Sequence, residues 1–567
     1  MDEMQNIDIK GYVARAIFQS GLELTLDRGD ILVVVGPNNA GKSRSLKDIS
    51  ASLESRAEGV VVKEADFIRI TPLEDIEAWI EPFRGANGTV SVGGAAFPMG
   101  MLKNWWGDQK KGLGKFLHGR SVSELTTRAR LADCDPAATY DRRDPFSADH
   151  PFQHFHRDDK LELKASKLFR RAFKKDLVIH TGNSKNIPAY VGDRPKPGRG
   201  EDRRSSTYLD RIETLDKLEE QGDGMRSFAS ILGRVLAERR PLIIIDEPEA
   251  FLHPPQARLL AEIIGAEAAD RQMLLATHSS EVLQGLLGNH SERVSVVRLT
   301  RTRKGGGAVL LARKKLQDLW KDPILRFSNV MDGLFHDAVI LTEADADCRF
   351  YEALASVSTN PEIRPDIHYT YSGGKDRLAV VVTALRALKV PVVTIADFDL
   401  LNNEATMSRI VAAHGGNWAK LEPDWRTLKA AVEENASFVG ADRFKTEMSA
   451  LIKTVKPGGA VEKTILSNVK ALARNASPWD HAKQSGLASL PNGPATQAAK
   501  ALLGGLKAIG IFVAPVGEME GFCRSVGGHG PRWVAEVTKR DLARDLELAE
   551  GRAFMSEVVD HISKQLA

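Results

Sequence analysis

The stretch "VVVGPNNAGKS", residues 33–43, joins an apolar strand to the start of a helix and decides the class of the N-terminal fold. A glycine ends the apolar run, and after four more residues comes a Gly-Lys-Ser triplet. In such a loop the backbone N–H groups and the helix N-terminus hold phosphates, the lysine reaches the β- and γ-phosphates, and the serine binds Mg²⁺. The pattern predicts an ATP site made by Gly36, Asn38, Asn39, Gly41, Lys42 and Ser43.

Two later strand ends supply the groups that act on a bound γ-phosphate. In "PLIIIDEPEAFLHP", residues 241–254, an apolar strand ends at Asp246, which suits Mg²⁺ held through water, and at Glu247, which suits a base for the attacking water. In "LLATHSS", residues 274–280, a strand ends at His278, within reach of the γ-phosphate. The alternative is that these polar residues merely end core strands.

Together these segments resemble the ABC-type ATPase head, in the branch that carries the "DEPE…LHP…ATHS" sequence motifs. The ABC signature loop is expected before Asp246, where "EQGDGMRSFASIL", residues 220–232, aligns only through Gly224. In ABC proteins this loop closes over the ATP of the opposite subunit, so the resemblance implies a head-to-head homodimer or a larger homo-oligomer.

Composition sets limits on the rest of the chain. The 567 residues are enough for two to four domains, and a net charge of +3 neither requires nor excludes a nucleic-acid partner. The three cysteines form no metal or disulfide pattern, and neither a signal peptide nor a bilayer-spanning apolar run is recognised. We expect a cytoplasmic protein without a membrane partner.

One helical segment, residues 157–176, carries lysines and arginines opposite an apolar stripe. A solvated basic face is the simpler interpretation, and a nucleic-acid or subunit contact is the alternative.

The second half of the chain brings carboxylates to the ends of apolar strands. "AVILTEADADCRFYEAL", residues 338–354, predicts a strand ending in Glu343 and a helix whose first turn carries Asp347. "VPVVTIADFDLLNN", residues 390–403, predicts a strand that delivers Asp397 and Asp399 to the same side, because residues two apart in a strand share a face. Such a cluster is costly without a cation, and its oxygen ligands suit Mg²⁺ or Mn²⁺. The alternative is a set of separate surface carboxylates.

Three more residues extend this candidate metal centre. Lys375, in the loop "SGGKDR" at residues 372–377, is placed to meet a phosphate, although a surface lysine is an equal alternative. A third apolar strand, in "GIFVAPVGEMEGF" at residues 510–522, is followed by Glu518 and Glu520, which would complete a second metal site.

These acids resemble the Toprim pattern of Glu-Gly-x-x-Asp followed by Asp-x-Asp, with Ala344 replacing the glycine. An ABC head followed by a Toprim domain is the architecture of the OLD (overcoming lysogenization defect) nuclease family. The resemblance implies a metal-dependent nuclease governed by ATP, and for some members a role in anti-phage defence, alone or with an accessory protein.

We therefore expect an α/β chain with two domains: an ABC-type ATPase head at residues 1–325, with a helical or irregular insertion at about 55–215, and a Toprim domain with helical additions at residues 335–567. The predicted function is an ATP-regulated endonuclease that uses Mg²⁺ or Mn²⁺, with DNA favoured over RNA. Two alternatives stay open: an ATP-switched interaction protein with a Toprim scaffold, and a Toprim ribonuclease that cuts, for example, tRNA.

Overall fold

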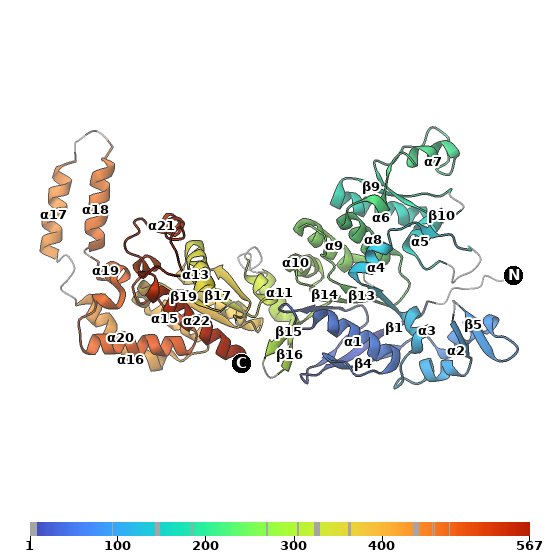
Figure 1. The fold of residues 1–567 in the computed structure, drawn as a ribbon, viewed down its shortest axis with the longest axis horizontal. Coiled ribbons are helices and arrows are strands. Elements are labelled where there is room, and N and C mark those ends of the chain that lie inside the picture. The colour runs from blue at the N-terminus through green and yellow to red at the C-terminus, as the bar shows by residue number, and fades with distance from the viewer. Residues whose placement is uncertain are drawn as a thin grey trace. The chain divides into compact units, whose positions relative to one another are not determined.

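The computed structural model describes residues 8–567 except 93–94, 142–147, 183–184, 268–269, 303–304, 322–328, 361–363, 435–440, 456–457, 459 and 476. The chain divides into two compact units, Met1–Phe327 and Ser328–Ala567. Both units are mixtures of helices and strands (Figure 1).

The first unit is built on a six-stranded sheet with the order β16-β15-β3-β14-β13-β7. All neighbouring strands are parallel except β15 and β16, which form an antiparallel pair at one edge. The central strands are continuous apolar runs that are fully buried, as parallel strands covered on both faces should be. The strands are β3 (Ile31–Val35), β7 (Val122–Leu125), β13 (Leu242–Asp246), β14 (Gln272–Ala276), β15 (Val294–Thr302) and β16 (Gly305–Leu311).

Helices and smaller sheets surround this central sheet. An antiparallel sheet, β2-β1-β4, packs through β4 on the helix α1 that follows the phosphate loop. A third sheet has the order β12-β11-β9. The bounds are β1 (Gly11–Phe18), β2 (Glu23–Thr25), β4 (Val62–Arg69), β9 (Asp176–Ile179), β11 (Ala189–Gly192), β12 (Asp216–Lys217), α1 (Lys42–Ser55), α2 (Leu73–Ile80), α3 (Gly114–Ser121), α4 (Thr127–Ala132), α5 (Pro151–Arg157), α6 (Asp159–Phe173), α7 (Ser206–Ile212), α8 (Asp223–Ala237), α9 (Pro254–Glu267), α10 (Ser280–His290) and α11 (Arg313–Lys321).

The stretch 55–215, expected to be a helical or irregular insertion, contains strands as well as helices. Two of its strands belong to the sheets of the head itself, since β4 pairs with β1 and β7 pairs with β13. In the strand β4, "VKEADFIR", the apolar residues stand at 62, 65, 67 and 68 and do not alternate regularly with polar ones, so its strand character is hard to see in the sequence.

The basic segment at 157–176 forms the predicted helix, α6, and its charges are largely paired within the unit. Lys164 lies 2.6 Å from Glu267, and Arg170 binds Asp176 at 2.8 Å. Further pairs join Arg171 to Glu262 and Lys175 to Asp216. This face of α6 is therefore used mostly for intramolecular ion pairs.

The second unit is a four-stranded parallel sheet, β18-β17-β19-β20, covered by helices. Its core contains an aromatic cluster in which the Phe350 and Trp533 ring centroids lie 4.9 Å apart. The elements are β17 (Ala338–Thr342), β18 (Ile367–Tyr371), β19 (Val392–Ala396), β20 (Ile511–Val513), α13 (Asp345–Ser358), α14 (Lys375–Ala387), α15 (Glu404–Ala413), α16 (Trp418–Glu433), α17 (Ala441–Lys453), α18 (Lys463–Asn475), α19 (Pro478–Ser485), α20 (Pro494–Ala508), α21 (Pro531–Val537) and α22 (Ala549–Leu566).

The connection between β19 and β20 is the largest addition to this sheet. It holds the helices α15 to α20, of which α17 and α18 lie side by side as a hairpin (Figure 1). In the part of the chain that the structure describes, no helix is both long and apolar enough to cross a membrane.

Candidate functional site

The phosphate loop between β3 and α1 has the backbone that a phosphate cradle requires. Three of its residues have positive φ angles: Gly36 at 143°, Asn39 at 60° and Gly41 at 97°. A Cβ at Gly36 would collide with the backbone carbonyl of Leu299, so only glycine fits there. The loop turns directly into α1, whose first N–H groups have no intrahelical partner and can bind an anion.

Lys42 folds over this loop. Its Nζ donates hydrogen bonds to the carbonyl oxygens of Gly36 at 2.8 Å and Pro37 at 2.7 Å. The side chain is buried, and desolvation lowers the pKa of Lys42 to about 8, although the carboxylates of Asp246, Glu247 and Glu249 raise it. A buried cation in a loop of N–H donors is suited to the phosphates of a nucleotide.

Ser43 and Asp246 meet at the same point from α1 and β13. Burial raises the pKa of Asp246, and a hydrogen bond from the Ser43 hydroxyl lowers it. The Oδ1 atom of Asp246 is buried and has no hydrogen-bond partner among the described residues. Mg²⁺ prefers a hydroxyl and a carboxylate oxygen of this kind, so these two residues fit a nucleotide-bound magnesium ion.

Glu247 and His278 lie next to each other beside Lys42. Glu247 has a positive φ angle of 50°, and its Oε1 lies 3.4 Å from Nε2 of His278. Burial, together with the nearby Lys42 ammonium, lowers the pKa of His278. The structure thus brings the predicted loop, Asp246, Glu247 and His278 together.

Two residues at this site were missed by the sequence reasoning. Glu249 accepts a 2.6 Å hydrogen bond from the backbone N–H of His278 and so fixes that strand end. Arg130, a fully buried side chain on α4, donates to the carbonyl oxygens of Asp246 at 2.7 Å and Glu247 at 3.0 Å. The second acid of "DEPE" was a visible signal for Glu249, whereas nothing in the sequence links Arg130 to residues more than a hundred positions away.

Gly224 lies in the first turn of α8. A Cβ at this position would lie 2.7 Å from the carbonyl oxygen of Phe251, so close helix packing accounts for the glycine. Asn38 lies in the phosphate loop itself, as predicted.

In the second unit, the predicted acids gather at the carboxyl edge of the parallel sheet. Glu343 follows β17, Asp397 and Asp399 follow the adjacent strand β19, and Asp347 lies in the first turn of α13. The Oδ2 atom of Asp347 accepts a 3.0 Å hydrogen bond from the Ala344 N–H, which turns it back toward the strand end.

The ionisation of these acids reflects their crowding. Burial, with Asp397 and Asp399 nearby, raises the pKa of Glu343 to about 7. Burial and Asp397 raise the pKa of Asp347 to about 6, and burial also raises the pKa of Asp397. Glu343 Oε1 and Asp399 Oδ1 are buried without a hydrogen-bond partner in the described structure. Unpartnered carboxylate oxygens in a mutually repelling cluster fit divalent metals with oxygen ligands, such as Mg²⁺ or Mn²⁺.

Two lysines supply the positive charge in this cluster. Lys375, at the start of α14, lies 2.9 Å from Asp399 Oδ2. Lys483, on α19, lies 3.1 Å from Asp397 Oδ2 and 3.5 Å from Asp399 Oδ2. Lys375 was predicted, but Lys483 was not, because it belongs to a helix more than eighty residues beyond these acids.

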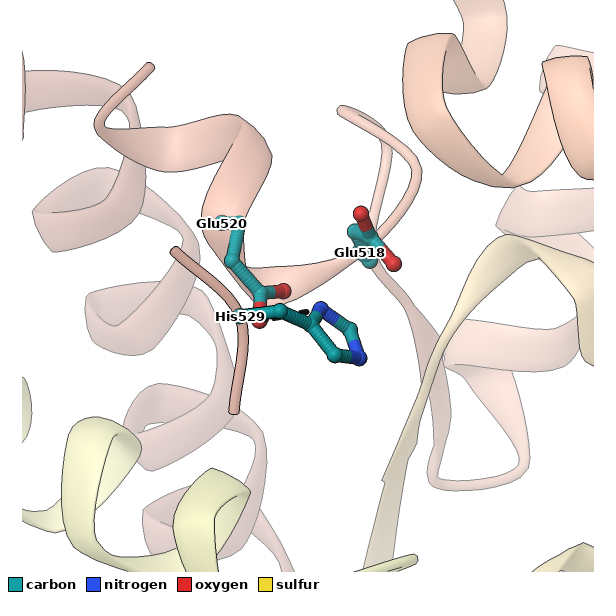
Figure 2. A group of neighbouring side chains, drawn as sticks. All are labelled: Glu518, Glu520 and His529. Atoms are coloured by element: carbon teal, nitrogen blue, oxygen red, sulfur yellow. Dashed lines mark ion pairs between the residues drawn. The ribbon is translucent and has the colours of Figure 1, made fainter. Parts of the chain in front are cut away.

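Glu518 and Glu520 form a group with His529 (Figure 2). One ligand atom from each residue lies within 4.8 Å of the others, a spacing that fits a cation. Glu520 Oε1 lies 2.8 Å from His529 Nδ1 and accepts a 2.7 Å hydrogen bond from the Gly530 N–H. Burial, with Glu520 and Asp397 as neighbouring charges, raises the pKa of Glu518 to about 7, so this group faces the same centre.

Comparison with known families agrees with this division of the chain. Residues 147–284 match the model described as "AAA domain, putative AbiEii toxin, Type IV TA system". Residues 334–399 match the model "Overcoming lysogenization defect protein-like, TOPRIM domain", a range that contains Glu343, Asp347, Lys375, Asp397 and Asp399. An ATPase domain followed by an OLD-like Toprim domain is the arrangement that the resemblance to the OLD family implies. The predicted resemblance and fold class are confirmed.

Solved structures that resemble the chain are distant in sequence. The Smc head domain from Thermotoga maritima is 11% identical, with 54% of this chain and 100% of that chain covered and a TM-score of 0.27. A Smc head domain from Pyrococcus furiosus, bound to the C-terminal domain of ScpA, is 11% identical over 55% of this chain and 99% of that chain, with a TM-score of 0.30. A nucleotide-free ATP-binding cassette from an ABC transporter is 11% identical, with coverages of 51% and 87% and a TM-score of 0.23. None of the curated proteins matches the chain.

Proposed function

We propose that the chain is an ATP-regulated, metal-dependent nuclease. The observation that carries this proposal is the carboxylate cluster after β17 and β19, with its unpartnered Glu343 and Asp399 oxygens and two lysines against it. A scaffold does not need to keep such a destabilising cluster, whereas a phosphodiesterase does. Within the chain, residues 1–325 serve as the ATPase head and residues 335–567 as the Toprim nuclease.

The residues of the carboxylate cluster divide into metal ligands and a phosphate contact. Glu343, Asp347, Asp397 and Asp399 hold divalent metal, and Glu518 and Glu520 add ligands. Metals at such a centre neutralise charge and stabilise the attacking and leaving oxygens of a phosphodiester. Lys375 contacts a phosphate oxygen of the nucleic acid, which keeps the scissile group close to the carboxylates.

ATP in the head supplies the control. Lys42 and the N–H groups of the loop bind the phosphates, while Ser43 and Asp246 hold Mg²⁺. Glu247 orients and deprotonates the attacking water, and His278 responds to the γ-phosphate. We propose that nucleotide binding pairs two heads in a homodimer, with the turn at Gly224 facing the partner.

The nucleic acid, for which DNA is favoured over RNA, has a suitable contact surface on the second unit. The hairpin of α17 and α18 carries Lys445, Lys453, Lys463 and Lys470, which are exposed and have no ion-pair partner among the described residues. Free lysines at a protein surface bind phosphates with little sequence preference. A cytoplasmic role in anti-phage defence, alone or with an accessory protein, follows from the family resemblance.

A cleavage assay with the purified protein tests the proposal. The protein is incubated with Mg²⁺ or Mn²⁺ and with labelled duplex DNA, single-stranded DNA or tRNA, each with and without ATP. We expect cutting by the wild type, loss of cutting in Asp397→Ala, and altered ATP dependence in Lys42→Ala. If ATP is hydrolysed but no substrate is cut, and no divalent metal binds, the switch-and-scaffold alternative replaces the nuclease. Cutting of tRNA alone would assign the ribonuclease activity instead.

A further inference from the structure

Lys483 lies where a cation is expected to bind in the carboxylate centre. Its Nζ is 3.1 Å from Asp397 Oδ2 and 3.5 Å from Asp399 Oδ2, so one ammonium bridges both acids of the Asp-x-Asp pair. The side chain is 28% exposed, which leaves it a path toward solvent. Lys375 differs, because it contacts only Asp399.

The backbone around Lys483 fixes it relative to these acids. Gly517, in the turn before Glu518, accepts a 2.7 Å hydrogen bond from the Phe398 N–H, which lies between the two aspartates. The same glycine has a φ angle of 109° and lies so close to the Lys483 carbonyl oxygen that a Cβ would collide with it. The Asp-x-Asp turn, the Glu518 turn and α19 are thus held together at one point.

Helix α19 is also anchored at both ends. Ser477 caps its N-terminus through the Asp480 N–H, and Pro478 occupies the first helical position. Just beyond its C-terminus, the Leu487 N–H donates to the Pro515 carbonyl oxygen at 2.9 Å. A lysine on so short and well-fixed a helix has a defined position, and only its side chain is free to move.

We propose that Lys483 is a positioning residue that holds Asp397 and Asp399 together before metal binds, competes with divalent metal for them, and then turns its ammonium to the phosphate backbone of the nucleic acid. This inference rests on the proposed nuclease function. The two aspartates need a counter-charge in the metal-free protein, and one site cannot hold both the ammonium and a metal ion. The released ammonium stays within a side-chain length of the acids, where the scissile phosphate must lie.

The test is Mn²⁺ titration by calorimetry on the full-length protein at about pH 8, where carboxylates are ionised. Lys483→Met removes the competing charge and keeps the apolar stem, so we expect Mn²⁺ binding to tighten by roughly tenfold. Lys483→Arg keeps the charge and should bind Mn²⁺ no more tightly than the wild type. Gln484→Ala, the exposed neighbour on α19, should leave Mn²⁺ affinity unchanged.

Tightening is the decisive readout, because a residue that only stabilises the fold would weaken metal binding when removed. Lys483→Gln is a second neutral variant if Lys483→Met fails to fold. The same variants should bind a short DNA duplex more weakly in Ca²⁺, with a shallower salt dependence. Unchanged or weaker Mn²⁺ binding in the neutral variants overturns the inference. If the wild type binds no Mn²⁺, or Asp397→Ala binds it equally well, the proposed function itself fails.

Discussion

The ionisation of Lys42 connects the affinity for ATP to pH. Its pKa is lowered to about 8 by burial, so above that pH the metal-free, nucleotide-free site holds mostly a neutral amine. Phosphate binding requires the charged ammonium form of Lys42. Above the pKa the neutral amine must first be protonated, and the free energy of that protonation opposes binding. We expect the Kd for ATP to be constant below about pH 7.5 and to rise toward tenfold per pH unit above about pH 8.5.

Calorimetric titration without Mg²⁺ across this range measures the effect. Lys42→Met has no ammonium, so its weak binding should not vary with pH in the same range. A wild-type Kd that stays constant to about pH 9.5 contradicts the assigned contact between Lys42 and phosphate.

The acids of the second unit should make metal binding depend on pH in the opposite direction. Glu343 and Glu518 have pKa values raised to about 7, and that of Asp347 is raised to about 6. Because these pKa values are higher in the folded than in the unfolded state, the acids destabilise the metal-free fold progressively as the pH rises from about 4 to about 7, and the loss is complete above that pH. Mn²⁺ removes that penalty by binding the ionised forms and displacing protons.

Thermal unfolding with and without Mn²⁺ tests this point. The metal-free melting temperature should be higher at about pH 5.5 than at about pH 8, and the increase caused by Mn²⁺ should be much larger at about pH 8. Asp397→Asn is the control, since it loses a metal ligand and should show little Mn²⁺ effect at either pH. An equal Mn²⁺ effect at the two pH values would place the metal elsewhere.

Residues that follow strands were predictable, and residues brought in by packing were not. Asp397 and Asp399 could be placed near each other because they follow an apolar strand, although β19 ends at Ala396 and Asp399 lies in the 3-10 turn Phe398–Asn402, so the two-residue repeat of a strand does not hold there. The phosphate loop could be placed from its glycine spacing. Lys483 and Arg130 reach their sites through tertiary contacts between distant segments, and His529 reaches Glu520 through the local turn that follows it. One sequence contains no signal for such contacts, because each of these residues looks like an ordinary surface charge.

At the level of elements, the contact of α19 with the Glu518 turn depends on Gly517. An alanine there would need a left-handed backbone and would collide with the Lys483 carbonyl, so we expect Gly517→Ala to lower the free energy of unfolding by about 1–3 kcal/mol. It should also weaken Mn²⁺ binding by displacing α19. Denaturant unfolding and calorimetry measure the two effects.

Gly504→Ala is the matched control for this substitution. Gly504 lies within α20, and a Cβ there would meet no atom within 4 Å. Its replacement should stabilise the protein by up to about 1 kcal/mol, because alanine favours a helix more than glycine does. Equal stability changes at the two glycines would mean that the α19 contact contributes little.

The two basic elements of the chain should differ in their effect on nucleic-acid binding. The lysines of the α17–α18 hairpin have no acidic partner in the described structure, whereas those of α6 are largely paired. Changing Lys445, Lys453, Lys463 and Lys470 to glutamine should weaken the binding of any DNA duplex. The slope of the logarithm of the binding constant against the logarithm of the salt concentration should become less steep by up to about four.

Fluorescence anisotropy over a salt series measures this dependence in Ca²⁺. A control variant with Lys164→Gln and Lys175→Gln on and near α6 should keep the wild-type slope. If the α6 variant loses binding and the hairpin variant does not, the nucleic-acid surface lies on the first unit.

For the whole molecule, the order of the motifs along the chain predicted more than the details of any one unit. The strand-loop-helix around Lys42 and the acids after β17 and β19 indicated two α/β units joined in one chain, and the structure has them. The segment at 55–215 was harder, because its strands β4 and β7 join sheets whose other strands lie far away in sequence. Strand pairing over such a sequence separation cannot be read from the local sequence and is seen only in the complete fold.

The proposed coupling between the two units can be tested by stopping ATP hydrolysis after binding. Glu247→Gln keeps the loop, Lys42 and Asp246 but removes the carboxylate that activates water, so hydrolysis should fall by about 100-fold or more while ATP stays bound.

If two heads close on ATP, light scattering should show a doubled mass for this variant with ATP, and no ATP-dependent change for Lys42→Ala. The two variants hold the nucleotide-bound and nucleotide-free states, so their rates of DNA cutting should lie on opposite sides of the wild-type rate. Equal cutting by both variants would mean that ATP does not control the Toprim centre, even if each unit is active alone.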